Sequence, residues 1–133
     1  MTRSSPLSDN QGFVYQSHLT SQSQAIPGVS YTILRMSFGR RMELLRLIRE
    51  LAVKLPYLEA SSDLREQVEA NLLTQQIDEL YLRWGLTALK GLTIDGEAAT
   101  AGSLIESGPE ELTKEIAAAI KAQCGLSEDE RKN

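Results

Sequence analysis

Apolar residues recur at helical spacing in two long segments, residues 37–55 and 63–84. Ser37 and Asp63 stand at the starts of these segments, and both residue types cap helices by accepting hydrogen bonds from the first free amides. We expect Pro56 to end or kink the first helix, because proline lacks an amide hydrogen and its ring crowds the preceding turn. The short connection predicts that the two helices form an antiparallel hairpin.

The first helix has a wide apolar face, which covers an arc of about 160° when residues are spaced at 100°. A surface helix with a single neighbour needs a narrower face, so the rest of this surface is either covered by the later helices or open to a partner. Tyr81 and Trp84 lie near the end of the second helix and are expected in the core, with a partner contact as the alternative. The candidate partner-binding residues are Leu44, Leu45, Leu47, Ile48, Leu51, Tyr81 and Trp84.

Shorter elements flank the hairpin. Residues 29–36 are rich in β-branched and aromatic side chains and predict a strand, for which residues 86–94 are the candidate partner. Asp95 and Gly96 predict a tight turn after that strand, and Gly85 predicts a glycine stop at the end of the second helix.

A last helix follows Pro109, which is favourable in a first helical turn. Glu110 and Glu111 come next, where the helix dipole favours acids, and Gly125 provides a stop signal. The predicted fold class is therefore mainly α, with a helical hairpin, a C-terminal helix and a minor β element.

The domain organisation follows from where the periodicity begins and ends. Residues 1–27 are polar and predict a flexible N-terminal arm; the alternative is that an apolar subset docks as an edge strand. Residues 28–126 predict a single mainly helical domain, and residues 127–133 a frayed C-terminal tail. The apolar subset of the arm is Phe13, Val14, Tyr15 and Leu19.

Charge gives no general reason to bind nucleic acid or an anionic membrane, since the formal net charge is −4. One basic cluster departs from this balance, and we expect it to be solvated or paired with acids elsewhere in the chain. The basic residues are Arg35, Arg40, Arg41, Arg46, Arg49 and Lys54. The acids expected to pair with them are Asp78, Glu79, Glu110, Glu111 and Glu115.

Catalytic chemistry has little support in the sequence. The chain has one histidine, His18, and one cysteine, Cys124, and no spacing suggests a metal site, a cofactor site or a catalytic triad. An enzyme is therefore the least expected class. A single cysteine cannot form an internal disulfide, and no apolar run is long enough for a signal peptide or a membrane span. These features predict a protein of a reducing, cytoplasmic setting.

Several segments, in their order along the chain, resemble small prophage proteins encoded among tail genes. The family that they resemble is that of the tail assembly chaperones of long-tailed bacteriophages, and the resemblance covers roughly residues 29–133. The segments are Ser37-Phe38-Gly39-Arg40-Arg41, Tyr81-Leu82-Arg83-Trp84-Gly85-Leu86, Gly91-Leu92-Thr93-Ile94-Asp95-Gly96-Glu97-Ala98-Ala99-Thr100, Gly108-Pro109-Glu110-Glu111-Leu112 and Leu126-Ser127-Glu128-Asp129-Glu130-Arg131-Lys132-Asn133. None of them is a catalytic signature.

The resemblance implies a chaperone that binds the long helical tape measure protein and keeps it soluble while the tail tube assembles. Two alternatives remain open. A structural tail or neck component would have similar helices but would self-assemble, with the arm clasping a neighbouring copy. A small DNA-binding regulator would use the basic residues between 40 and 49, and its binding would weaken steeply with salt.

Overall fold

The protein is described by a computed structural model, which places residues 12–124. This part of the chain is mixed α and β with helix predominating, so the predicted class is confirmed at that level. The elements in order are β1 (His18–Gln22), β2 (Ser30–Leu34), α1 (Phe38–Glu59), α2 (Leu64–Gly85), β3 (Leu86–Lys90), β4 (Thr93–Ile94), β5 (Glu97–Ala98), α3 (Ala101–Ser107) and α4 (Glu110–Gln123).

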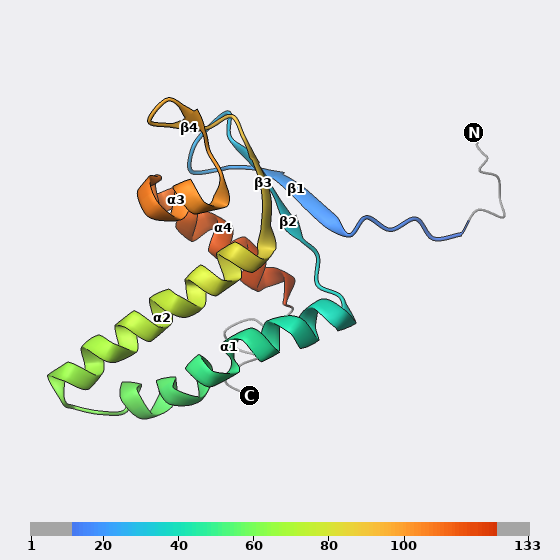
Figure 1. Ribbon diagram of the computed structural model, residues 1–133. Coiled ribbons are helices and arrows are strands. Elements are labelled where there is room, and N and C mark those ends of the chain that lie inside the picture. Colours follow the sequence, from blue (N-terminus) through green and yellow to red (C-terminus); the bar gives the residue numbers. More distant parts are fainter. Residues whose placement is uncertain (1–11, 125–133) are drawn as a thin grey trace.

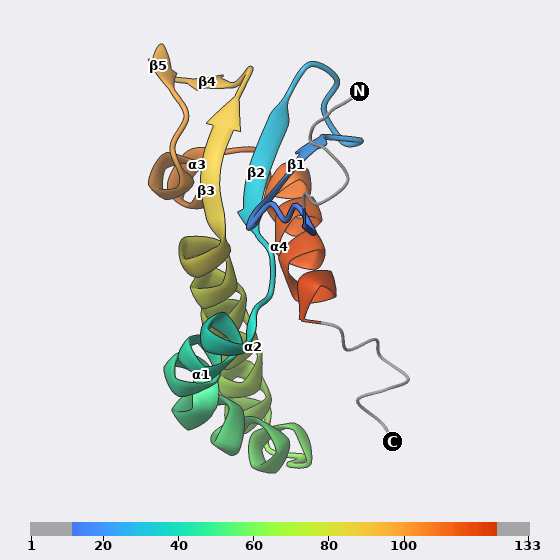
Figure 2. The same ribbon diagram turned by 90° about the vertical axis from the view of Figure 1, so that its right-hand side faces the viewer.

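A three-stranded antiparallel sheet, in the order β1-β2-β3, forms one end of the molecule (Figure 1). The pairing of β2 with β3 confirms the strand and partner predicted from residues 29–36 and 86–94. Helix α4 contacts β2, and α3 contacts β3, so the two helices cover the sheet (Figure 2). The main core lies between these layers and comprises Val29, Tyr31, Ile33, Leu82, Leu86, Leu104, Leu112, Ile116, Ala117 and Ile120.

Helices α1 and α2 form the predicted antiparallel hairpin, which projects away from the sheet (Figure 1). Both expected caps are present: Ser37 Oγ accepts from the amide of Arg40, and Asp63 Oδ1 accepts from the amide of Arg65. The C-terminal half of α2 belongs to the main core through Leu82. Helix α1, by contrast, packs chiefly on α2. Much of its surface therefore faces away from the rest of the chain.

Three local predictions need correction. The N-terminal arm is not structureless up to residue 27, because residues 18–22 form β1 at the edge of the sheet. Leu19 lies in that strand, whereas residues 13–15 precede it. Helix α1 does not end at Pro56 but continues to Glu59, because only one amide is lost and the last turn is closed by Ala60 N–H donating to Pro56 O.

The third correction concerns Gly85. It ends α2 as predicted, but its φ is not positive, so it is not a left-handed cap. The chain passes directly from α2 into β3. The predicted turn at Asp95 and Gly96 is confirmed, since both have positive φ (52° and 85°) and join β4 to β5. The predicted tail 127–133 and the stop at Gly125 lie outside the described residues.

Candidate functional site

An apolar groove lies between α1 and α2, beside the end of α4. Its volume is about 400 Å³. Most of its lining is aliphatic, and its polar groups come from Thr74, Asp78, Lys121 and the hydroxyl of Tyr81. The lining residues are Leu45, Ile48, Ala52, Leu55, Pro56, Thr74, Ile77, Asp78, Tyr81, Lys121 and Cys124.

The groove continues onto the outer surface of α1 as a second hollow of about 520 Å³. The two hollows share Leu45, Ile48 and Ala52, so they form one continuous surface. The outer hollow adds Met42 and Val53, which are 43% and 76% exposed, together with Arg46 and Arg49. We call this combined surface the α1 groove.

The seven predicted partner-binding residues fall into three groups. Leu45, Ile48 and Tyr81 line the α1 groove. Leu44 is only 2% exposed and is therefore a core residue of the hairpin. The other three, Leu47, Leu51 and Trp84, lie outside the lining of the groove.

Leu47 and Trp84 occupy other parts of the hairpin. Leu47 is 46% exposed, but it lies two residues beyond Leu45 and so about 200° around the helix. Trp84 is half-buried against the main core, and its Nε1 donates to Glu43 Oε1 at 2.9 Å. This hydrogen bond ties the start of α1 to the end of α2.

Sequence reasoning missed Met42 and Val53, which belong to the groove. A signal existed, because Met42, Leu45, Arg49 and Val53 follow one another at intervals of three or four residues and so form their own stripe. That stripe was hidden by the stronger leucine pattern on the face toward α2.

The basic cluster is not paired with the acids that the sequence suggested. Arg40 Nη1 donates to the backbone oxygens of Ser17 and Arg35 at 2.6 and 3.1 Å. Arg41 Nη1 donates to Cys124 O at 2.7 Å, which ties α1 to the end of α4. These two guanidinium groups therefore act as structural links to carbonyl oxygens.

The acids in question have other partners. Asp78 pairs with Lys121 across α2 and α4, and Glu79 and Glu110 pair with cations one turn away on their own helices. Glu115 accepts hydrogen bonds instead of pairing with an arginine. Glu79 and Glu110 thus pair within one helical turn, whereas Asp78 and Glu115 are engaged by residues distant in sequence that the fold brings next to them.

Cys124 closes the groove as a thiol. Burial raises its pKa, and the nearby Arg41 and Tyr81 oppose that effect without reversing it. Because the thiolate is the reactive form, a raised pKa makes this side chain a poor nucleophile at neutral pH. Cys124 therefore contributes apolar surface at the end of the groove.

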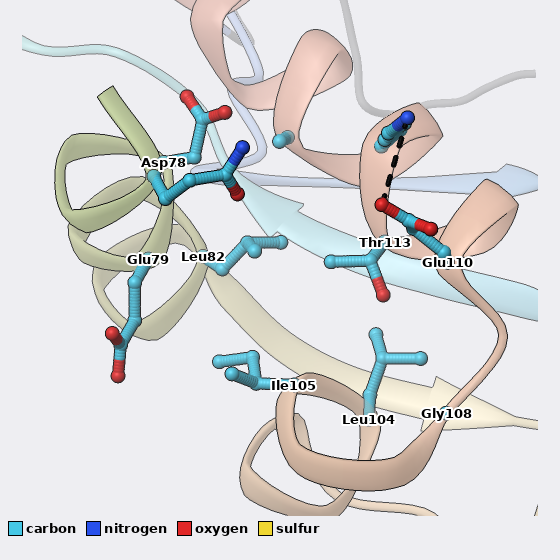
Figure 3. A pocket seen from close by; sticks show the side chains of 11 residues that line it. Asp78, Glu79, Leu82, Leu104, Ile105, Gly108, Glu110 and Thr113 are labelled. Atoms are coloured by element: carbon cyan, nitrogen blue, oxygen red, sulfur yellow. Dashed lines mark ion pairs between the residues drawn. The ribbon is translucent and has the colours of Figure 1, made fainter. Parts of the chain in front are cut away.

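A second pocket of about 410 Å³ lies between α2, α3 and α4 (Figure 3). Leu82, Leu104 and Ile105 converge on it, while the carboxylates of Asp78 and Glu79 point away from these side chains (Figure 3). Both carboxylates, and that of Glu110 at the rim, are engaged in the ion pairs described above. The floor of the pocket is therefore apolar, and the acidic side chains beside it are already paired with cations.

One carboxylate makes an unusual concentration of hydrogen bonds away from the groove. Glu115 of α4 accepts from Ser23 Oγ at 2.8 Å, from the amides of Gln24 and Ala25 at 3.0 and 3.1 Å, and from Tyr31 Oη at 3.2 Å. It therefore fastens the turn between β1 and β2 to α4. These bonds join residues about ninety positions apart in the sequence, so no local sequence pattern predicts them.

Within residues 12–124, no three His, Cys, Asp or Glu side chains gather as metal ligands, and no helix is both long and apolar enough to cross a bilayer. The chain matches no protein-family model, no curated protein and no solved structure. Its function is therefore inferred from the α1 groove and from the resemblance of its sequence.

Proposed function

We propose that this protein is a phage tail assembly chaperone that holds an apolar stripe of the tape measure protein in the α1 groove. The observation that carries the proposal is the continuous apolar surface over Leu45, Ile48 and Ala52, open to solvent on a helix that packs chiefly on one neighbour. An exposed apolar surface of this kind commonly marks a site where a partner binds.

The shape of the groove favours a helix as the bound element. Two antiparallel helices leave a furrow along their junction, and a third helix fills it by inserting one row of side chains. Burying a Leu, Met or Val side chain contributes about 1.5–3 kcal/mol, so three or four such contacts give useful affinity after the costs of association. A long helical protein offers repeated stripes of this kind.

The basic side chains beside the groove indicate which charges the bound helix should carry. Arg46 and Arg49 line the outer hollow next to Met42 and Val53. A bound helix with acidic residues beside its apolar stripe would complement these guanidinium groups, and like charges there would oppose binding. The net charge of −4 on the whole chain would help to keep a complex dispersed.

The two other functions remain as competing proposals. A DNA-binding regulator loses support because Arg40 and Arg41, which it would use, donate to backbone oxygens of the chain itself. A structural tail component would require self-association, for which the open edge of β1 is a candidate surface.

Co-expression with the tape measure protein of the same phage or prophage tests the proposal. We expect the tape measure protein to be insoluble when expressed alone and to co-elute with this protein in size-exclusion chromatography when both are expressed. A tape measure protein that stays insoluble, or that is soluble without co-eluting, would contradict the chaperone function. Retention on DNA that weakens with salt would instead support the regulator.

A further inference from the structure

Strand β1 has an open edge. It pairs with β2 alone, and among residues 12–124 nothing pairs with its outer side. The backbone bonds at its two ends show which residues point outward: Arg35 N–H donates to Ser17 O, and Ser23 N–H donates to Val29 O. Odd-numbered residues of this strand therefore bond to β2, so the amide and carbonyl groups of His18, Thr20 and Gln22 face away from the sheet.

This edge has none of the features by which proteins usually block strand addition. Its sequence, His-Leu-Thr-Ser-Gln, contains no acid, lysine, arginine or proline. Its register with β2 runs without a bulge from His18 to Gln22. The edge is thus competent to accept another strand.

The segment before β1 adds exposed apolar surface in line with that edge. Residues 12–17 leave the body of the protein in an extended path (Figure 1). Phe13 and Val14 on this path are 91% and 68% exposed. Burying such exposed apolar side chains is favourable, and a partner that lies alongside the following strand would bury them.

We propose that a second copy of this chain pairs with the open edge, β1 against β1, in an antiparallel two-fold arrangement centred on Thr20. In this register Thr20 faces its own counterpart, and His18 faces Gln22 of the other copy. All three residues direct their backbone groups outward, so the same ladder of hydrogen bonds is satisfied from both sides. The two three-stranded sheets become one six-stranded sheet.

A second copy fits this edge better than a charged or irregular peptide. The strand contains no acid, lysine or arginine, and in this register His18 faces Gln22, so two copies can lie side by side without like charges facing each other. Antiparallel pairing also carries the exposed Phe13 and Val14 of each copy past the end of the other β1, toward its turn at residues 23–28.

The test combines mass measurement with a matched pair of variants. Light scattering across a concentration series should give a dimer for the full chain. Thr20→Lys sets two ammonium groups face to face and should weaken dimerisation on the order of tenfold, whereas Thr20→Val, which loses the same hydroxyl, should not. A monomer at every concentration, or equal behaviour of the two variants, would overturn the proposal.

Amide hydrogen exchange on the unmodified chain provides a second readout that does not depend on how the variants fold. The outward amides of His18, Thr20 and Gln22 should be protected at concentrations where the dimer forms and should exchange freely on dilution. If these amides stay unprotected in the dimer, the interface lies elsewhere and the proposal fails. If they become protected only when another protein is added, the edge binds that protein and a second copy is excluded.

Discussion

Gly85 at the end of α2 lies directly against Ile120 of α4. A Cβ atom on residue 85 would stand 2.8 Å from Ile120 Cγ2 and 3.0 Å from its Cδ1. Ile120 is fully buried, and side chains in a close-packed core have little room to shift. The close approach of α2 to α4 therefore depends on the absence of a side chain at this position.

We predict that Gly85→Ala lowers the free energy of unfolding by about 1–3 kcal/mol, the usual cost of overpacking a core. Gly39 in the first turn of α1 is the matched control, because a Cβ there meets nothing within 4 Å. Gly39→Ala should instead raise stability by up to about 1 kcal/mol through helix propensity. Urea unfolding followed by circular dichroism measures both, and a Gly85→Ala variant as stable as the parent would contradict the packing described.

Gly91 and Gly96 provide a sharper comparison, since their φ angles are nearly equal at 84° and 85°. A Cβ on Gly91 would lie 2.1 Å from Gly28 O, whereas one on Gly96 meets nothing within 4 Å. Gly96→Ala should therefore cost about 1–2 kcal/mol from backbone strain alone. Gly91→Ala carries the same strain and a collision with backbone, so it should unfold the protein at markedly lower temperature.

Thermal unfolding of the two glycine variants separates strain from collision. The difference between their midpoints reports the collision alone, because the strain is common to both. Equal midpoints would mean that the turn at residue 28 moves freely away from Gly91.

Most helical and strand positions were accessible from sequence because local chemistry determines them. Ser37 and Asp63 cap their helices as expected, and the β-branched residues of β2 pair with β3. An edge strand in the arm was only the alternative to a flexible arm, because β1 contains one apolar residue, Leu19, and owes its conformation to the neighbouring β2. Gly85 ends α2 as predicted, but its close packing against Ile120 could not be foreseen, because a glycine that stops a helix and a glycine that allows close packing look the same in one sequence.

The groove was only partly accessible for a related reason. The leucine pattern of α1 identifies an apolar face but does not say which part of it α2 covers. Leu44 and Leu45 are neighbours in sequence, yet the first is buried and the second is 53% exposed. That division depends on the rotation of α1 against α2, which is a tertiary property.

Glu115 should make stability depend on pH. Burial raises the pKa of the Glu115 carboxyl. Hydrogen bonds from Gln24, Ser23, Ala25 and Tyr31 together lower this pKa by a larger amount, so it lies below its ordinary value of 4.5. A carboxyl with a lowered pKa stabilises the folded state fully above its unfolded pKa, and this contribution is lost as the pH falls through the folded pKa. The stabilisation is thus complete at neutral pH and lost in acid.

We predict that Glu115→Gln costs about 1.5–3 kcal/mol at neutral pH, the value of hydrogen bonds to a charged acceptor. The cost should shrink as the pH falls below about 4.5, where the carboxyl of the unfolded chain becomes protonated, and should vanish below the lower pKa of the folded state, where the native carboxylate is protonated too. Glu111→Gln, at an exposed position one turn earlier on α4, is the control and should change little. A cost that is independent of pH would show that the charge of Glu115 does not contribute.

The central claim, that the α1 groove binds a helical partner, is tested most directly by a pair of charge substitutions on α1. Leu45 and Leu47 are similarly exposed, at 53% and 46%, but only Leu45 lines the groove. A glutamate at either position meets water in the free protein, so both variants should fold. The measurement is the amount of tape measure protein that co-elutes with each variant after co-expression. Leu45→Glu should abolish co-elution while Leu47→Glu retains it; equal co-elution of the two variants, or loss with Leu47→Glu alone, would contradict the account.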